Sequence, residues 1–207
     1  MKVIFFDLDD TLLNSMEAEY NAICKFKRNN NFDNIESEEF WKTWRTSTRG
    51  QYDRYLKGEI SFQEQRIRRI QELYTRYGRT LSIQDANEKF DEYLSIYEKE
   101  WMVFDDTIEV LEELSGKYKL GVITNGDEKQ QRDKITHTGI IKYFDQIIIS
   151  GEVGVAKPSK EIFDIACKRM NALPEECIMV GDKYEIDIMG AINAGLTAIW
   201  VNRNHRR

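Results

Sequence analysis

Short apolar runs alternate with amphipathic stretches along the second half of the chain, from about residue 103 onward. Runs rich in Ile and Val are typical of buried strands, and apolar residues at helical spacing are typical of helices. The predicted strands are Val3–Phe6, Leu120–Thr124, Gln146–Ser150, Cys177–Gly181 and Thr197–Val201, and the predicted helices cover residues 107–118, 128–138, 160–171 and 185–194. The alternation predicts a parallel sheet with helices on both faces, which is an α/β, Rossmann-like, three-layer core of about five to six strands.

Residues from about 15 to 100 show a different pattern, with no convincing strand and with charged and aromatic residues at helical spacing. The stretch from Ser61 to Glu64 has the form of a capping box, and Gly50, Gly58 and Gly78 are interpreted as breaks between helices. The pattern predicts a bundle of about four helices, inserted after the first strand. We therefore expect an α/β core domain of residues 1–14 and 101–207 and a helical domain of residues 15–100.

The composition is that of a globular protein, with 41% hydrophobic and 32% charged residues in a chain of 207. The net charge of −6 makes the surface a poor electrostatic match for a nucleic-acid backbone, so we expect no nucleic-acid partner. No apolar run approaches the roughly 18 residues that span a bilayer, so we expect no membrane partner. Small anionic substrates remain possible if a site supplies its own cations.

The three cysteines, Cys24, Cys167 and Cys177, match no zinc-binding spacing. We interpret them as reduced thiols of a cytoplasmic protein, because the apolar run near the N-terminus is too short for the core of a signal peptide. The sequence leaves the oligomeric state open between monomer and homodimer. Residues 204–207 are interpreted as a frayed basic end without function.

Two carboxylates follow the first predicted strand, Asp7 and Asp9. In an extended chain the side chains of residues i and i+2 point to the same side, so these two groups are expected to project together. Two like charges at that distance repel each other unless a cation lies between them or one takes up a proton. A divalent ion of the Mg²⁺ type, which prefers oxygen ligands, is the simplest solution. The alternative is an acidic turn in which Asp10 or Thr11 caps a helix.

Polar residues also follow the other predicted strands. Thr124 and Asn125 come at the end of the second strand, Lys157 follows the third, and Asp182 and Asp187 follow the fourth. In open α/β sheets ligands bind beyond the carboxyl ends of the strands, so these residues are expected to converge on one rim of the sheet. Each residue alone has a structural alternative, as a turn, a surface lysine or a helix cap.

These residues resemble the four motifs of the haloacid dehalogenase superfamily, a group composed mostly of phosphatases. The matching segments, in order, are Asp7–Thr11, Thr124–Gly126, Lys157-Pro158, and Gly181-Asp182 with Asp187. The helical insertion resembles the α-helical cap of subfamily I, and segments 122–126 and 150–158 are most similar to the pyrimidine 5′-nucleotidase branch. The sequence departs from the family pattern at Asp10, where glycine is common, and at Lys183-Tyr184, where small or polar residues are common.

The resemblance implies a Mg²⁺-dependent phosphatase that hydrolyses small phosphorylated metabolites through an aspartyl phosphate. In this interpretation Asp7 is the nucleophile, the Asp9 side chain is the general acid and base, and Lys157 neutralises the nucleophile and the phosphate. Thr124 and Asn125, with Lys157, would bind the phosphate. Asp7, the Asp9 backbone carbonyl and Asp182 would hold the metal, and Asp187 would orient Lys157 or a metal-bound water.

The resemblance also makes the helical insertion a lid that closes over the site and selects the substrate. The residues expected on its substrate-facing wall are Trp41, Trp44, Arg45, Arg49, Tyr52 and Tyr55. The alternative for Trp41 and Trp44, which lie three residues apart, is the core of the bundle. Arg66, Arg68 and Arg69 are interpreted as a solvated helix face.

Several activities stay open at this point. A nucleoside 5′-monophosphate phosphatase, a phosphoglycolate or sugar-phosphate phosphatase, an acylneuraminate phosphatase and a phosphomutase would all share these motifs. A 2-haloacid dehalogenase uses one nucleophilic aspartate and no metal, so Asp9 and Asp182 would serve no purpose in it. A non-catalytic interaction module would be expected to lack Asp7, Asp9 or Lys157, and all three are present.

Overall fold

The computed structural model describes residues 2–203, and the basic end predicted at 204–207 lies outside these residues. The chain divides into two compact units, one made of residues 1–16 and 101–207 and the other of residues 17–100. The first unit ends at residue 16 and not at residue 14 as expected. The first two residues of helix α1 (Ser15–Asn29) therefore belong to the first unit. None of the helices in residues 2–203 combines the length and the apolar character needed to cross a bilayer.

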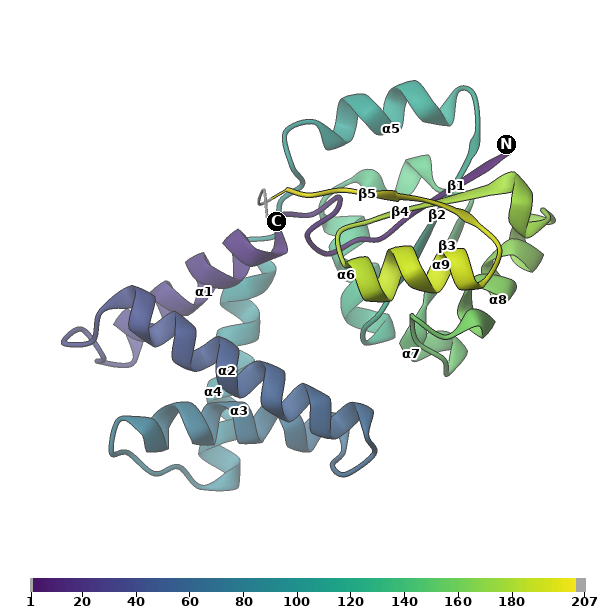
Figure 1. The fold of residues 1–207 in the computed structure, drawn as a ribbon. Coiled ribbons are helices and arrows are strands. Elements are labelled where there is room, and N and C mark those ends of the chain that lie inside the picture. Colours follow the sequence, from purple (N-terminus) through teal and green to yellow (C-terminus); the bar gives the residue numbers. More distant parts are fainter. Residues whose placement is uncertain (1, 204–207) are drawn as a thin grey trace. The chain divides into compact units, whose positions relative to one another are not determined.

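The first unit is built on a five-stranded parallel sheet, which confirms the predicted fold class. Its strands are β1 (Val3–Phe6), β2 (Lys119–Thr124), β3 (Gln146–Ile149), β4 (Cys177–Gly181) and β5 (Thr197–Trp200), in the order β3-β2-β1-β4-β5 (Figure 1). Val3 pairs with Lys119 on one side and with Cys177 on the other, so β1 lies in the middle of the sheet. This central position places the carboxyl end of β1 between those of β2 and β4.

Helices cover both faces of this sheet (Figure 1). They are α5 (Thr107–Ser115), α6 (Glu128–His137), α7 (Ser150–Val153), α8 (Lys160–Met170) and α9 (Met189–Asn193). Because side chains alternate along a strand, Val3 and Phe5 join one apolar core with residues of α8 and α9. Ile4 and Phe6 join the opposite core with residues of α5 and α6. The sheet is therefore the middle one of three layers.

Two connections differ from the sequence-based prediction. Ser150 was expected to end a strand, but it begins the short helix α7. The helix predicted over 185–194 consists of a π-helical turn, Tyr184–Ile188, followed by α9. The wider turn matters for the site, because it brings Asp187 back to the end of β4.

The second unit contains four helices among its described residues: α1, α2 (Ser37–Leu56), α3 (Phe62–Arg76) and α4 (Ile83–Glu98). Ser61 accepts a hydrogen bond from the Glu64 backbone N at 3.1 Å, so it caps α3 where the capping box was predicted. The break predicted at Gly50 is wrong, since α2 continues to Leu56. Gly58 and Gly78 do follow helices and adopt a positive φ of 72°, a conformation that favours glycine.

Candidate functional site

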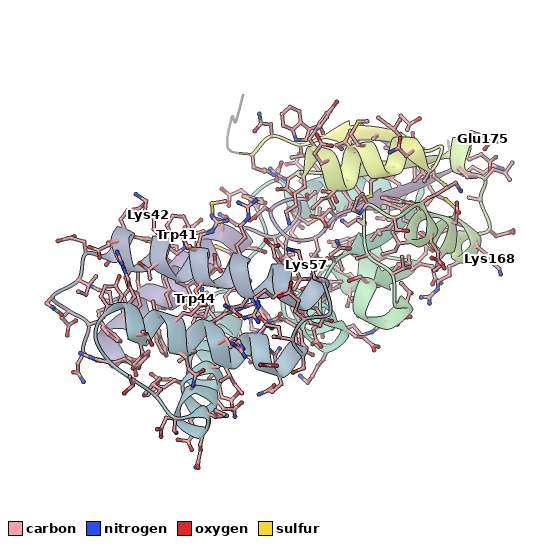
Figure 2. All side chains as sticks on the ribbon, turned by 60° about the horizontal axis from the view of Figure 1, so that its bottom comes forward. Trp41, Lys42, Trp44, Lys57, Lys168 and Glu175 are labelled. Atoms are coloured by element: carbon pink, nitrogen blue, oxygen red, sulfur yellow. The ribbon has the colours of Figure 1, made fainter. Side chains whose placement is uncertain are left out.

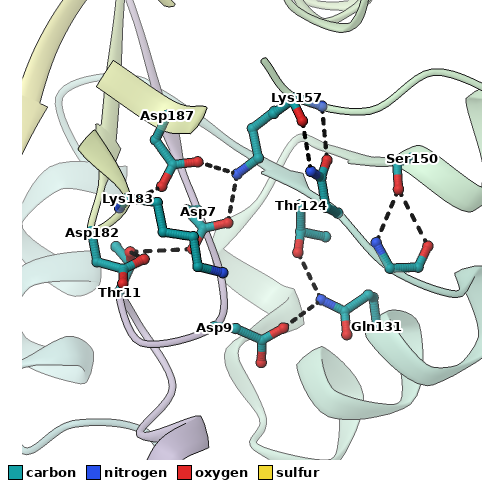
Figure 3. A network of polar contacts seen from close by, with 12 residues as sticks. Asp7, Asp9, Thr11, Thr124, Gln131, Ser150, Lys157, Asp182, Lys183 and Asp187 are labelled. Atoms are coloured by element: carbon teal, nitrogen blue, oxygen red, sulfur yellow. Dashed lines mark hydrogen bonds and ion pairs between the residues drawn. The ribbon is translucent and has the colours of Figure 1, made fainter. Parts of the chain in front are cut away.

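The predicted residues at the carboxyl ends of the strands lie together in the first unit (Figure 3). Asp7 follows β1, Thr124 ends β2, Asp182 follows β4, and Lys157 comes from the loop between α7 and α8. These are loops at one edge of a parallel sheet, which is where α/β folds build ligand sites. The side chains form two connected groups, one around Lys157 and one around Asp9.

Lys157 lies between two buried carboxylates. Its Nζ donates a hydrogen bond to Asp7 Oδ1 at 2.6 Å and forms an ion pair with Asp187 Oδ1 at 2.7 Å that lacks hydrogen-bond alignment. All three residues are almost completely buried. Burial alone would lower the pKa of Lys157, but the two carboxylates more than offset it and raise the pKa, so the ammonium stays charged.

Asp187 reaches this position because the residue at the end of β4 is glycine. A Cβ on Gly181 would lie only 2.5 Å from the Asp187 Cβ, which is closer than real side chains approach. Asp187 also accepts a hydrogen bond from the Lys183 backbone N at 3.0 Å, which fixes its second oxygen. Its carboxylate therefore faces Lys157, as expected for a residue that orients this lysine.

Asn125 binds the backbone of Lys157 through its side-chain amide. Its Nδ2 donates to the Lys157 backbone O, and its Oδ1 accepts from the Lys157 backbone N, both at 2.9 Å. This bidentate contact uses both polar atoms of the amide. Asn125 therefore holds the loop that carries Lys157, and phosphate binding through its second N–H stays a prediction.

The Asp9 carboxylate is held by two residues of α6 and by Ser15 of α1. Lys134 Nζ lies 2.7 Å from Asp9 Oδ1, Ser15 donates to the same oxygen, and Gln131 Nε2 donates to Asp9 Oδ2 at 2.9 Å. Gln131 also donates to Thr124 Oγ1 at 2.7 Å, so it connects the ends of β1 and β2 (Figure 3). Burial alone would raise the pKa of Asp9, but Lys134 and the hydrogen bonds hold this pKa well below its usual range.

Gln131 and Lys134 were missed by the sequence analysis. They lie three residues apart on α6, and both are buried although both are polar. The sequence shows that these two polar residues share one face of a helix. It does not show whether that face packs against the sheet or faces solvent. With these partners the Asp9 carboxylate points away from the other acids, so only the backbone carbonyl of Asp9 remains as an expected metal ligand.

Three carboxylates of the first unit form a cluster suited to a cation. Oxygens of Asp7, Asp182 and Asp187 lie within 4.8 Å of one another, and Thr11 Oγ1 lies 3.3 Å from Asp7 Oδ2. Burial and, next, the neighbouring Asp7 raise the pKa of Asp182 to about 7. Burial likewise raises the pKa of Asp7, although Lys157 opposes the shift. Closely spaced oxygen donors that disfavour their own ionisation fit Mg²⁺, which would supply the charge that they lack.

Asp10 has a structural role. It adopts a left-handed backbone conformation with φ 62°, which explains why glycine is common at this position of the family motif. Asp tolerates this region better than most residues, and Asp10 Oδ1 accepts a hydrogen bond from the Met16 backbone N at 2.8 Å. This bond supports the predicted alternative in which Asp10 caps the following helix.

The structure changes the assignment of two residues in the helical unit. Trp44 is completely buried, packs 4.4 Å from the ring centre of Tyr93 and donates to Glu19 at 3.2 Å, so it belongs to the core of the bundle and not to a substrate-facing wall (Figure 2). Arg69 is half-buried and only partly solvated. Its Nε is buried without a hydrogen-bond partner, and burial lowers its pKa to about 10.

The other residues predicted for the wall are accessible to different degrees. Arg45 and Arg49 are exposed, and Tyr52 and Tyr55 are half-buried with ring centres 5.8 Å apart. Trp41 packs edge-on against Tyr20, with the Arg45 guanidinium 5.3 Å from the centre of the Trp41 ring. Arg45, Arg49 and Tyr52 therefore stay available as surface residues of the helical unit.

Comparison with known proteins gives a consistent family. A family model described as haloacid dehalogenase-like hydrolase matches residues 1–195. Over 100 residues the chain is 46% identical to the pyrimidine 5′-nucleotidase YjjG of Escherichia coli, which covers 48% of this chain and 44% of that protein. It is 34% identical over 210 residues to a glyceraldehyde 3-phosphate phosphatase of Pyrococcus abyssi, which covers 97% of this chain and 81% of that protein. The match to YjjG thus spans less than half of that relative.

A solved structure supports the same grouping. The HAD phosphatase from Thermococcus onnurineus has a TM-score of 0.65 and 30% identity, covering all of this chain and 89% of that one. The magnesium-bound YfnB of Bacillus subtilis is similar in fold, with a TM-score of 0.83, 24% identity and coverage of 100% and 89%.

Proposed function

Because the chain belongs to the haloacid dehalogenase-like hydrolases, we propose that it is a Mg²⁺-dependent phosphatase that acts on small phosphate monoesters. The observation that carries the proposal is the arrangement around Asp7. Its carboxylate lies at the end of the central strand, next to the Lys157 ammonium and within the cluster of three acids. A carboxylate that attacks an anionic ester needs nearby positive charge, and this arrangement supplies one cation and a place for a second.

In the proposed reaction, Asp7 attacks the phosphorus and the ester oxygen leaves. Lys157 offsets the negative charge on Asp7 and on the phosphoryl oxygens, and the Thr124 hydroxyl is a donor to the transferring group. Asp7, Asp182 and the Asp9 carbonyl would hold Mg²⁺, which would supply further charge compensation when bound. Asn125 and Asp187 keep Lys157 in place, one through its backbone and the other through its ammonium.

Asp9 would transfer the protons in both halves of the reaction. Its ionised state, stabilised by Lys134, suits the second half, in which a base accepts a proton from the water that attacks the phosphoryl group. In the first half Asp9 must carry a proton for the leaving oxygen, so it has to give up its contact with Lys134 first. Lys134 and Gln131 would thereby position the group that transfers protons.

For the substrate, we propose a nucleoside 5′-monophosphate. The support is the similarity to the E. coli protein named as a pyrimidine 5′-nucleotidase. A relative of equal identity is named for glyceraldehyde 3-phosphate, and others for N-acylneuraminate 9-phosphate, so other small esters are direct competitors. The helical unit is proposed as the lid that discriminates among them, with Arg45, Arg49 and Tyr52 as the residues that contact the substrate.

The test is release of inorganic phosphate from a panel of monoesters, measured with saturating Mg²⁺ and again after chelation with EDTA. We expect Mg²⁺-dependent release that is highest with a pyrimidine nucleoside monophosphate, and loss of release in Asp7→Asn. Release that survives complete chelation would overturn the metal requirement. Transfer of the phosphoryl group to another position of the substrate, without free phosphate, would indicate a mutase instead.

A further inference from the structure

Lys183 is a second lysine that faces the acidic cluster. It follows Asp182 directly, and its amino end points into the space between Asp7, Asp182 and Asp9 (Figure 3). Its backbone N is bonded to Asp187. Within residues 2–203, however, the Lys183 ammonium itself forms no hydrogen bond or ion pair, whereas Lys157 and Lys134 are each held by a carboxylate. Lys183 is therefore held at the cluster by charge attraction and not by a specific contact.

The attraction between Lys183 and the cluster is strong in both directions. Burial would lower the pKa of Lys183, but Asp7 and then Asp182 raise it to about 12, so the ammonium keeps its charge. In turn, Lys183 lowers the pKa of Asp182 and of Asp7, against the effect of burial. The Lys183 ammonium thus stabilises the ionised form of the same carboxylates that would bind a divalent ion.

This position places Lys183 in conflict with a metal ion. Two cations cannot share three carboxylates at short range without repulsion, because the interaction between charges falls only slowly with distance in a partly buried site. The lysine side chain is long and flexible, and Lys183 is accessible to solvent, so its ammonium can move away into solvent or toward a bound anion. Asp7 and Asp182 have less freedom, since their side chains are short and each residue directly follows a strand.

We propose that Lys183 is a tethered competitor of the divalent ion, whose ammonium faces the acidic cluster in the metal-free protein and weakens metal binding until it is displaced. The inference rests on the proposed function only in taking Asp7 and Asp182, two members of the acidic cluster, as metal ligands. It adds a residue that tunes the affinity of that site. Release of Lys183 on metal binding also frees one ammonium near the place where phosphate would bind.

The experiment compares the affinity for Mg²⁺ of metal-stripped protein, measured by titration calorimetry without any substrate. Lys183→Met should bind Mg²⁺ about tenfold more tightly than the unchanged protein, because the competing charge is gone. Lys183→Arg keeps the charge and should stay close to the unchanged protein. Lys168→Met changes the net charge equally at an exposed position on α8 and should leave the affinity unaltered (Figure 2).

A second measurement follows thermal unfolding with EDTA and with saturating Mg²⁺. In EDTA, Lys183→Met should unfold at a lower temperature than the unchanged protein, because the carboxylates lose the lysine charge. Adding Mg²⁺ should raise its unfolding temperature by more than that of the unchanged protein. Lys183→Gln serves as a replacement if the Met variant does not fold.

Unchanged or weaker Mg²⁺ binding by Lys183→Met would overturn the proposal, and so would equal tightening by Lys183→Arg. Neither result bears on phosphatase activity, which the release assay tests separately. If the unchanged protein releases no phosphate but Lys183→Met still binds Mg²⁺ more tightly, only the proposed function fails.

Discussion

Two lysines next to two aspartates give these aspartates different properties. Lys157 is shared between Asp7 and Asp187, and the pKa of Asp7 is still raised by burial. Lys134 serves Asp9 together with Ser15 and Gln131, and there the pKa is lowered despite burial. Asp7, two residues earlier in the sequence, has to share its lysine with a second buried carboxylate. Opposite pKa shifts of this kind suit a nucleophile that needs a metal to stabilise its charge and a base that is ionised without a metal.

We predict that Lys134→Met shifts the acidic limb of the pH–rate profile to higher pH. Lys134 stabilises the ionised form of Asp9, so without it the pKa of Asp9 rises, and the activity that needs ionised Asp9 is lost at a higher pH as the pH falls. The measurement is kcat for phosphate release between pH 4 and 8, because kcat includes the second half of the reaction, in which ionised Asp9 acts as the base. Lys129→Met, on the same helix but paired with exposed Asp133, is the control and should keep the original profile. An unchanged acidic limb in Lys134→Met would show that Asp9 does not set it.

We predict that Asn125→Ala lowers kcat by about 10- to 100-fold with a smaller change in KM, because a loosely held Lys157 stabilises the transition state less. The matched variant is Asn125→Asp, which keeps the acceptor for the Lys157 backbone N, loses the donor to the Lys157 backbone O and adds a negative charge. It should retain more activity than Asn125→Ala. Equal losses in both variants, or a pure rise in KM, would contradict a positioning role.

The residues at strand ends could be predicted from sequence because their location follows from the strand pattern alone. Asp7 and Lys157 are separated by 150 positions, yet both follow strands of one parallel sheet. Gln131, Lys134 and the binding of Asn125 to the Lys157 backbone could not be predicted in this way. Their contacts depend on which face of α6 is buried and on the path of a loop, and both are set by packing.

At the scale of elements, the helical unit shows which features the periodicity of the sequence can predict. Its four helices and the cap at Ser61 follow local rules, and they match the predicted pattern. The break expected at Gly50 did not occur, because the cost of about 1 kcal/mol for glycine in a helix is small against the packing of a 20-residue helix. The buried Nε of Arg69 was not predicted, because packing decides it. Arg68, the preceding residue, pairs with Glu64 at the surface.

We predict that Arg69→Met leaves the helical unit as stable as before or stabilises it by about 1 kcal/mol. The buried Nε has no partner, so replacing the guanidinium by an apolar side chain removes a desolvation penalty. Urea unfolding followed by tryptophan fluorescence measures the change. Arg68→Met is the control, because its exposed pair with Glu64 contributes less than about 0.5 kcal/mol. A loss of several kcal/mol in Arg69→Met would mean that the guanidinium makes a contact that stabilises the fold.

At the scale of the whole molecule, the acidic cluster links stability to pH and metal. The folded state raises the pKa of Asp182 from 3.8 to about 7, so between these values the folded protein binds a proton that the unfolded chain releases. Stability of the metal-free protein should therefore fall as the pH rises through this window. Mg²⁺ should remove the effect, and its stabilisation should be larger at pH 8 than at pH 5.

Thermal unfolding in EDTA and in Mg²⁺ across this pH range tests the linkage. Asp182→Asn cannot ionise and should show a weaker decline with pH and a smaller response to Mg²⁺. If the metal-free protein becomes more stable as the pH rises from 5 to 8, the cluster does not carry the uncompensated charge that we assign to it.

The central claim is that Asp7 becomes covalently phosphorylated, and intact-protein mass spectrometry after acid quenching tests it most directly. The protein is mixed with Mg²⁺ and its best substrate, quenched within one turnover and weighed, beside Asp7→Asn treated in the same way. We predict that the unchanged protein gains the mass of one phosphoryl group, located by peptide mapping to Asp7, and that the variant gains none. Substrate turnover in which no phosphorylated protein forms, or a phosphoryl group located on a different residue, would contradict the account.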